Sequence, residues 1–277
     1  MDAELDLLPG QLDSNDKKPS DYASPQGNFL GIGYKLDGEE VKPVYQKIQN
    51  TQNLFVQPAG FKFDEQFKLE LKNFIFSQHP IIVYPQRIGQ DLVIGVNHRL
   101  NKLEEANNMI AYRNFEFVSL DDIEVKRIIM ERFQELNGSG LYQKSTVDNL
   151  LPLTPLEVKD ETTGIHVASF KNGITNDTID KIYHVDINQS TKAVQRLVKV
   201  PVNRNQIMAL ISLAFDIDEK DFFKSKMLNV LNAGKYNEAV SYFMDFSEMR
   251  MRDGRIGINQ NIYNRRLSEA NLFAKVI

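Results

Sequence analysis

An α+β fold that is mainly helical is predicted for this chain of 277 residues, and three observations support it. From about Asn176 onward, apolar residues recur at helical spacing almost without interruption. Upstream, residues 77–98 have the pattern of a strand, a glycine turn and a second strand. The length fits one large domain or two modest ones, and a hydrophobic content of 42% is enough for a substantial core.

Two helices are expected in the first half of the chain. Segment 63–76 carries Phe63, Phe67 and Leu71 at helical spacing, and it should stop near Pro80 because the residue before a proline resists helix. Segment 119–138 should begin at a Ser119 cap, end at Gly138, and bury one apolar side. The expected buried residues of that second helix are Ile123, Ile128, Ile129 and Phe133.

The second half is expected to be wholly helical. A long helix over residues 174–200 should end at Pro201, and the next segment is apolar nearly all round, so it should be buried. The buried segment is 203–217. Three further helical segments follow it, at 223–234, 235–249 and 259–273.

Two regions lack a strong periodic pattern. Residues 1 to about 28 are polar and rich in proline, aspartate and serine, which is typical of an extended arm, and a short strand and turn follow in residues 27–40. Residues 138–174 mix glycine, proline and threonine, which predicts an irregular insertion.

Composition excludes several classes of protein. The chain has no cysteine, so disulfides, thiolate metal sites and thiol nucleophiles are excluded. The net charge is −4 and no basic stripe is present, which argues against nucleic-acid binding. No run of about 18 apolar residues predicts a membrane span, and the acidic start MDAELDLLPG does not fit a secretory signal.

Three motifs in the helical half resemble the phage-type lysozymes, glycoside hydrolase family 24. They are RLVKVPVNRNQIMALISLAFDID (196–218), KMLNVLNAGKYNEAVSYF (226–243) and YNRRLSEANLF (263–273), and they follow the family's order. The resemblance covers roughly Thr175 to Phe273. It implies a two-lobed lysozyme-like fold, with a small β-hairpin lobe and a helical lobe joined by the long helix.

The resemblance also implies where active residues would stand in the hairpin. In the family a helix runs into a catalytic glutamate, a tyrosine follows seven positions later, and an aspartate lies near the hairpin turn. Tyr84 and VIGVNH (93–98) resemble that tyrosine and the end of the hairpin. The implied glutamate position is Ser77, or Gln78 if the register slips by one. The aspartate position is Gln86, the threonine position is Val93, and only His98 matches the family's active residues.

Glycosidic cleavage needs a proton donor and a second carboxylate. Serine and glutamine cannot fill either role, so the sequence predicts a chain that is not an enzyme, in which Gln78, Gln86 and His98 could still bind a sugar. Two acids could substitute for the missing pair: Glu70 on the preceding helix and Asp91 near the hairpin turn. The plainer interpretation places Glu70 on a solvated helix face and Asp91 in a turn.

Other polar residues are expected to have structural roles. Arg265, Arg266 and Glu269 should form ion pairs that hold the last helix. His184 and Asp186 do not face one side of their helix squarely and lack a third ligand, so no metal site is predicted. No cofactor is predicted either.

The expected organisation is an arm with a short β element (1–60), a reduced N-terminal lobe (61–137), an insertion (138–174) and a helical C-terminal lobe (175–277). The first functional hypothesis is an inactive structural protein of a phage particle, in the tail or baseplate, assembled in the host cytoplasm. The arm and the insertion would dock to other virion proteins. The alternatives are a peptidoglycan-binding module and an active muramidase, either an endolysin or a tail lysozyme.

Overall fold

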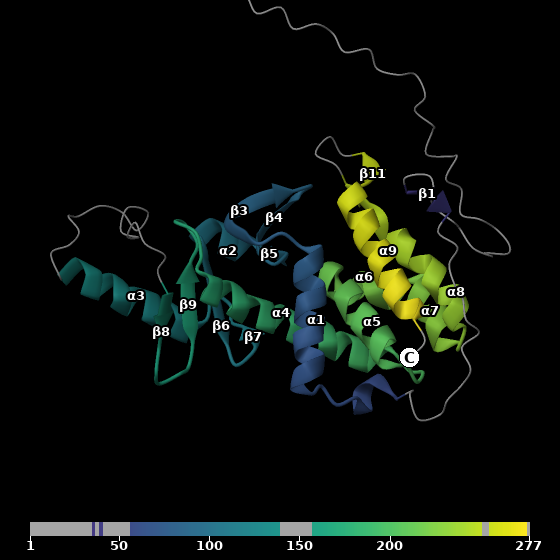
Figure 1. Cartoon of the computed structure of the whole chain (residues 1–277). Coiled ribbons are helices and arrows are strands. Elements are labelled where there is room, and N and C mark those ends of the chain that lie inside the picture. Colours follow the sequence, from purple (N-terminus) through teal and green to yellow (C-terminus); the bar gives the residue numbers. More distant parts are fainter. Residues whose placement is uncertain (1–34, 37–38, 41–55, 139–156, 251–254, 276–277) are drawn as a thin grey trace, which may run out of the picture. The chain divides into compact units, whose positions relative to one another are not determined.

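The computed structural model describes residues 35–36, 39–40, 56–138, 157–250 and 255–275. Backbone contacts divide the chain into two units, Met1–Tyr45 and Gln46–Ile277. In the first unit the described residues are two short antiparallel strands, β1 (Lys35–Leu36) and β2 (Glu39–Glu40), which fit the strand and turn expected there. The second unit carries all the other elements (Figure 1).

The second unit begins with a helix and a hairpin sheet. A 3-10 turn, η2 (Pro58–Gly60), precedes α1 (Glu65–Gln78), which starts where the Asp64 side chain accepts a 2.7 Å hydrogen bond from the backbone of Phe67. The helix stops at His79, directly before Pro80, as predicted. The sheet that follows has the order β3 (Ile82–Ile88), β4 (Asp91–Gly95) and β5 (His98–Arg99). We call this sheet the hairpin wall.

A second, four-stranded sheet follows the hairpin wall. Helix α2 (Lys102–Asn107) leads into β6 (Met109–Arg113) and β7 (Glu116–Phe117), and then into α3 (Ile123–Gly138). The sheet order is β7-β6-β9-β8, with β8 (Glu157–Lys159) and β9 (His166–Ser169) antiparallel to their neighbours. A small hydrophobic core, separate from the main one, lies between α3 and this sheet.

Two predictions for this region are wrong. The described second half of the 138–174 insertion is not irregular, because β9 pairs with β6 of the preceding lobe along its length. The N-terminus of α3 is held by Asp122, whose side chain accepts from the backbone of Glu124, and not by Ser119. Ile123 is 79% exposed at that terminus, while Ile128 is buried as expected.

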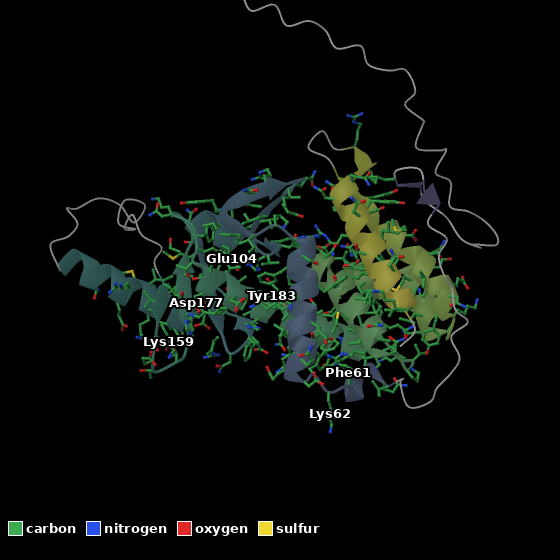
Figure 2. The ribbon with its side chains drawn as sticks, viewed as in Figure 1. Phe61, Lys62, Glu104, Lys159, Asp177 and Tyr183 are labelled. Carbon is green, nitrogen blue, oxygen red and sulfur yellow. The ribbon has the colours of Figure 1, made fainter. Side chains whose placement is uncertain are left out.

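The second sheet is tied to the long helix α4 (Asn176–Leu197) through one carboxylate. Glu157 of β8 accepts hydrogen bonds from Tyr112 (2.8 Å), Thr178 (2.9 Å) and Lys181 (2.7 Å). Burial by itself raises the pKa of Glu157, but these three donors outweigh it and lower the pKa to about 2. Asp177 and Lys159 mark this region in Figure 2.

Replacing Glu157 with glutamine is expected to destabilise the protein by about 1–3 kcal/mol, because a neutral amide pairs poorly with the Lys181 ammonium and half-buried donors lose an ionised acceptor. The free energy of unfolding from urea titration measures this. The control is Glu161→Gln, an exposed acid on the same sheet's loop. Equal stability of the two variants would contradict the anchoring role.

The C-terminal part is a helical lobe around α5 (Arg204–Asp216), which is buried almost all round as its composition predicts. Around it pack α4, α6 (Glu219–Lys224), α7 (Lys226–Asn232), α8 (Tyr236–Ser241), the 3-10 helix η4 (Tyr242–Ser247) and α9 (Gln260–Ala274). Strands β10 (Glu248–Arg250) and β11 (Ile256–Ile258) form a two-stranded sheet before α9. The predicted fold class, α+β and mainly helical, is confirmed.

Candidate active site

A groove runs between the hairpin wall and the helical lobe. It consists of two hollows of about 320 and 510 Å³ that share Asn97, Arg99, Asp216, Ile217 and Asp218. The smaller hollow continues along α4, past Asp186 and Gln189. The larger one lies between the turn of the hairpin and the residues of α6, η4 and α9.

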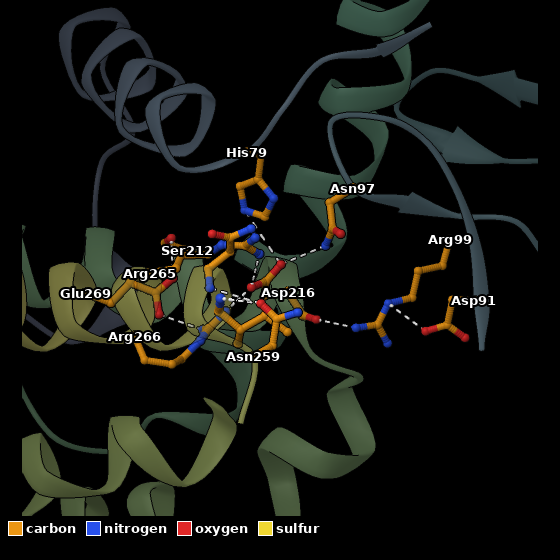
Figure 3. Close-up of polar contacts among 12 residues, drawn as sticks. His79, Asp91, Asn97, Arg99, Ser212, Asp216, Asn259, Arg265, Arg266 and Glu269 are labelled. Atoms are coloured by element: carbon orange, nitrogen blue, oxygen red, sulfur yellow. Dashed lines mark hydrogen bonds and ion pairs between the residues drawn. The ribbon is translucent and has the colours of Figure 1, made fainter. Parts of the chain in front are cut away.

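Asp216 is the central polar residue of the groove. It ends α5 and is only 6% exposed, yet residues from both sides of the groove converge on it (Figure 3). Arg265 and Arg266 of α9 pair with one carboxylate oxygen, and Asn97 donates a 2.7 Å hydrogen bond to the other. Arg99 donates to the Asp216 backbone carbonyl at 2.7 Å. The carboxylate therefore joins the hairpin wall to the helical lobe.

The arginines of α9 extend this network into the core. Arg266 and Glu269 are fully buried and form a 2.6 Å ion pair, and Glu269 also accepts from Ser212 at 2.6 Å. Burial raises the pKa of Glu269 and lowers the pKa of Arg265 to about 10. Both arginines have ion-pair partners on α5 or α9 and also line the larger hollow, so they hold the fold and shape the groove.

His79 occupies the place where α1 meets this network. Its side chain is 1% exposed, and its Nε2 lies 3.6 Å from Asp216 Oδ1 without forming a hydrogen bond. Burial, together with the positive charges of Arg265 and Arg266, lowers the pKa of His79 to about 2. The imidazole is therefore neutral at physiological pH, because burial and, after it, the two guanidiniums disfavour its charged form.

His98, the one residue that matches the family's hairpin motif, is held between two acids. Its Nδ1 lies 3.1 Å from Asp186 of α4, and its Nε2 lies 3.5 Å from Glu104 of α2. Burial disfavours the charged imidazole, but Asp186 and Glu104 outweigh burial and raise the pKa of His98 to about 10. His98 is therefore an ionised clamp between β5, α2 and α4.

The raised pKa of His98 predicts that the folded protein loses stability in mild alkali. Because the pKa of His98 is higher in the folded state than its usual 6.5, the stabilisation is complete below pH 6.5 and is lost as pH rises through about 10. The free energy of unfolding should fall by about 1–3 kcal/mol between pH 6.5 and 10. Urea titrations at several pH values give the free energy of unfolding as a function of pH. Its decrease with rising pH should be smaller for His98→Gln than for the unaltered chain, and an equal decrease in both would contradict the assignment of this pH dependence to His98.

Carboxylates line both sides of the larger hollow. Asp91 stands on the hairpin wall, where Arg99 Nε lies 3.6 Å from it. The opposite side carries four acids that form no ion pair with other described residues: Asp218, Asp221, Asp245 and Glu248. Partial burial and the negative charge of Glu248 raise the pKa of Asp245, although Lys226 opposes the shift. The Asp245 carboxyl group therefore keeps its proton to a higher pH than an ordinary aspartate does.

Comparison with known proteins identifies the family. A family model described as phage lysozyme matches residues 157–269. The endolysin of Acyrthosiphon pisum secondary endosymbiont phage 1 is 32% identical over 108 residues, which cover 39% of this chain and 73% of that endolysin. The chain belongs to the phage lysozyme family.

Other members of the phage lysozyme family match over shorter stretches. The Salmonella phage P22 endolysin is 35% identical over 71 residues, or 26% of this chain and 49% of that endolysin. The Bacillus phage B103 endolysin is 26% identical over 100 residues, 36% of each. Among solved structures, the muramidase domain of SpmX from Asticcacaulis excentricus has a TM-score of 0.44 at 16% identity, with 76% of this chain and 97% of that chain covered. A P22 lysozyme mutant has a TM-score of 0.39 at 17% identity, with 78% and 99% covered.

Membership in this family corrects the prediction that the chain is not an enzyme. The curated relatives are endolysins, so the family is enzymatic. The prediction was drawn from the absence of acids at positions inferred by counting along the hairpin. The groove, however, is lined by acids that come from the hairpin turn and from elements far along the chain.

The residues singled out by the lysozyme resemblance lie at different places. Ser77 is exposed and donates to Phe74 within its own helix, and Gln78 donates to Ser77 at 3.2 Å. Gln86 pairs with Val93 across the hairpin. Val93 lines the larger hollow, and His98 lines the smaller one. Ser77, Gln78 and Gln86 line neither hollow.

The two acids considered as substitutes are separated by the structure. Glu70 lies in the body of α1, pairs with Arg204 at 2.9 Å and lines neither hollow. Asp91 lines the larger hollow. In the described residues no three potential metal ligands come together, and Asp186 pairs with His98 rather than His184. No helix in the described part is long and apolar enough to cross a membrane.

Sequence reasoning missed Asp216, His79 and Asp245. Asp216 carried one usable signal, since it is the sole acid within the apolar run 206–217. His79 stands beside the helix-ending Pro80, one residue beyond the two positions considered for the glutamate. Nothing in the local sequence marks Asp245, because its neighbours in the groove are far away along the chain.

Proposed function

We propose that this member of the phage lysozyme family is an endolysin-type muramidase that hydrolyses the glycan strands of bacterial peptidoglycan in the groove. The observation that carries the proposal is the placement of acids on both sides of the larger hollow, Asp91 on one and Asp245 on the other. Glycosidic hydrolysis by a pair of carboxyl groups needs such an arrangement. The endolysin names of the relatives support it.

Asp245 is the proposed general acid. A carboxyl group that donates a proton to the leaving oxygen must retain that proton near the working pH, and the environment of Asp245 raises its pKa. Tyr242–Ser247 (η4) carries this side chain at the edge of the hollow, where it is exposed to an entering glycan. On protonating the glycosidic oxygen, Asp245 becomes a carboxylate.

Asp91 is the proposed second carboxylate. It would activate water or stabilise the positive charge that develops on the sugar ring. Its place on the hairpin is held through Arg99, which contacts Asp91 on one side and donates to the Asp216 carbonyl on the other. The Asp216 network thus acts as a positioning element beneath the acids that would meet the substrate.

The test is release of new reducing ends from purified peptidoglycan sacculi by the full chain. Muramidase activity predicts soluble fragments that end in N-acetylmuramic acid, as identified by mass spectrometry. Fragments cut at the amide or peptide bonds, or no soluble fragments at all, would refute the proposal. A blank reaction with the sacculi alone controls for spontaneous release.

A location in the phage particle is proposed for the same enzyme. The observation that favours it is a pair of exposed apolar side chains on α3, the helix that packs on the second sheet. They are Ile123 (79% exposed) and Met130 (55% exposed), which lie seven residues apart. Such exposed apolar residues are suited to docking on a protein neighbour. Mass spectrometry of purified particles tests this location, and absence of the chain from intact particles would exclude it.

A further inference from the structure

Asn97 stands at the junction of the two hollows. It is one of the residues that line both of them, and its φ angle of +70° is in the left-handed region. Glycine adopts this region freely, and asparagine is among the few other residues that tolerate it. What the asparagine side chain adds over glycine at this position is an amide group in the middle of the groove.

The contact with Asp216 fixes the direction in which this amide faces. Asp216 pairs with Arg265 and Arg266, so it is a carboxylate, and its oxygens can only accept hydrogen bonds. Asn97 must therefore offer its NH₂ group to Asp216, and the 2.7 Å hydrogen bond runs from Nδ2 to the carboxylate. Figure 3 shows the Asn97 oxygen pointing away from Asp216. This oxygen accepts no hydrogen bond from the described residues, so it is a hydrogen-bond acceptor of fixed direction.

Arg99 supplies a donor near this acceptor. It lies two positions beyond Asn97, it also lines both hollows, and its Nη2 donates to the Asp216 backbone carbonyl at 2.7 Å. Its Nε lies 3.6 Å from Asp91. A guanidinium carries five N–H donors, and Nη1 forms no hydrogen bond with the described residues. Both side chains are thus held on Asp216, and each leaves one hydrogen-bonding group for a ligand.

One acceptor and one donor together match a secondary amide. Each sugar of a peptidoglycan glycan strand carries such an amide, the 2-acetamido group. Its N–H can donate to the Asn97 oxygen, and its carbonyl can accept from Arg99. We infer that Asn97 and Arg99 bind the 2-acetamido group of the sugar at the junction of the hollows, and so make the groove specific for N-acetylated glycan. The inference rests on the proposed muramidase function, which puts a glycan in the groove.

Two tetrasaccharides that differ only at C2 test this inference. Tetra-N-acetylchitotetraose and cellotetraose share a β-1,4-linked backbone, with an acetamido group in the first and a hydroxyl group in the second. NMR titration of the full chain gives a dissociation constant for each. The unaltered chain should bind the acetylated sugar about tenfold more tightly, because the hydroxyl group leaves polar groups of the site unpaired. In Asn97→Gly this ratio should fall about threefold to tenfold, the range expected for one lost hydrogen bond.

The matched control is Asn108→Gly, the same substitution at another left-handed asparagine (φ +54°), which ends α2 and lines neither hollow. Its ratio should equal that of the unaltered chain. Glycine fits the left-handed backbone at both positions, so neither variant strains its turn. If Asn97 served only to hold Asp216, its loss would weaken the binding of both sugars by the same factor. An unchanged ratio in Asn97→Gly, or an unaltered chain that binds neither sugar or both equally, would overturn the inference.

Cleavage of sacculi, measured separately, distinguishes this inference from the proposed reaction. If the ratio of affinities depends on Asn97 but no reducing ends appear, the proposed reaction fails and the acetamido site stands. If reducing ends appear while the ratio is the same in Asn97→Gly as in the unaltered chain, the muramidase stands and the acetamido site is overturned.

Discussion

Replacing Asp245 with asparagine is expected to lower the rate of glycan cleavage by about 10²- to 10⁴-fold, the usual contribution of a general acid. Asparagine keeps the size of the side chain and its hydrogen-bonding capacity but cannot release a proton. Because Asp245 is exposed and forms no ion pair with other described residues, the fold should be unaffected. Release of reducing ends from sacculi measures the effect, and the unfolding temperature verifies the fold.

The control for this experiment is Glu161→Gln, which neutralises an exposed acid on the loop between β8 and β9, a residue that lines neither hollow. Its activity should equal that of the unaltered chain. A rate within a factor of a few for Asp245→Asn would remove Asp245 from the chemistry. In that case Glu248, on the same side of the hollow, would be the next acid to replace.

Replacing Asp216 with alanine is expected to destabilise the protein by about 3–5 kcal/mol, because it leaves buried arginine charge without its counterion. Arg266 would retain Glu269, whereas Arg265 would lose the carboxylate with which it pairs. Asn97 would also lose its attachment to the helical lobe, since it donates to this carboxylate, whereas Arg99 would keep its hydrogen bond to the backbone carbonyl. Urea unfolding followed by circular dichroism gives the difference in free energy.

Asp218→Ala is the matched control, since it removes an exposed acid two residues further along that has no ion pair in the described part of the chain. A change within about 0.5 kcal/mol is expected for it. If Asp216→Ala were no more destabilising than Asp218→Ala, the network would not be the connection between the two sides of the groove that its contacts indicate.

Local patterns were sufficient for the helices. The end of α1 follows from Pro80, and the burial of α5 follows from a segment that is apolar nearly all round. Strands β8 and β9 were missed because they are three and four residues long, and their stability comes from pairing with β6, which lies far upstream in the sequence. Short strands carry too little periodicity to be recognised alone.

The groove was harder to predict, for a geometric reason. Counting from Tyr84 assumes that this hairpin keeps the spacing of the family, but the register of β3 against β4 shifts between Ile82 and Gln86. A bulge of this kind re-aims side chains, so positions inferred by spacing do not point where they would in a regular hairpin. The acids that line the groove come from Asp91 and from residues 216–248, and only the folded chain brings them together.

The long separation between Asp216 and its two arginine partners has a consequence for synthesis. Arg265 and Arg266 follow Asp216 by 49 and 50 residues. A nascent chain that has left the ribosome only as far as α5 therefore has this acid without its counterions. The network around Asp216 can be completed only after α9 emerges, so the proposed glycan cleavage would require the docking of that helix.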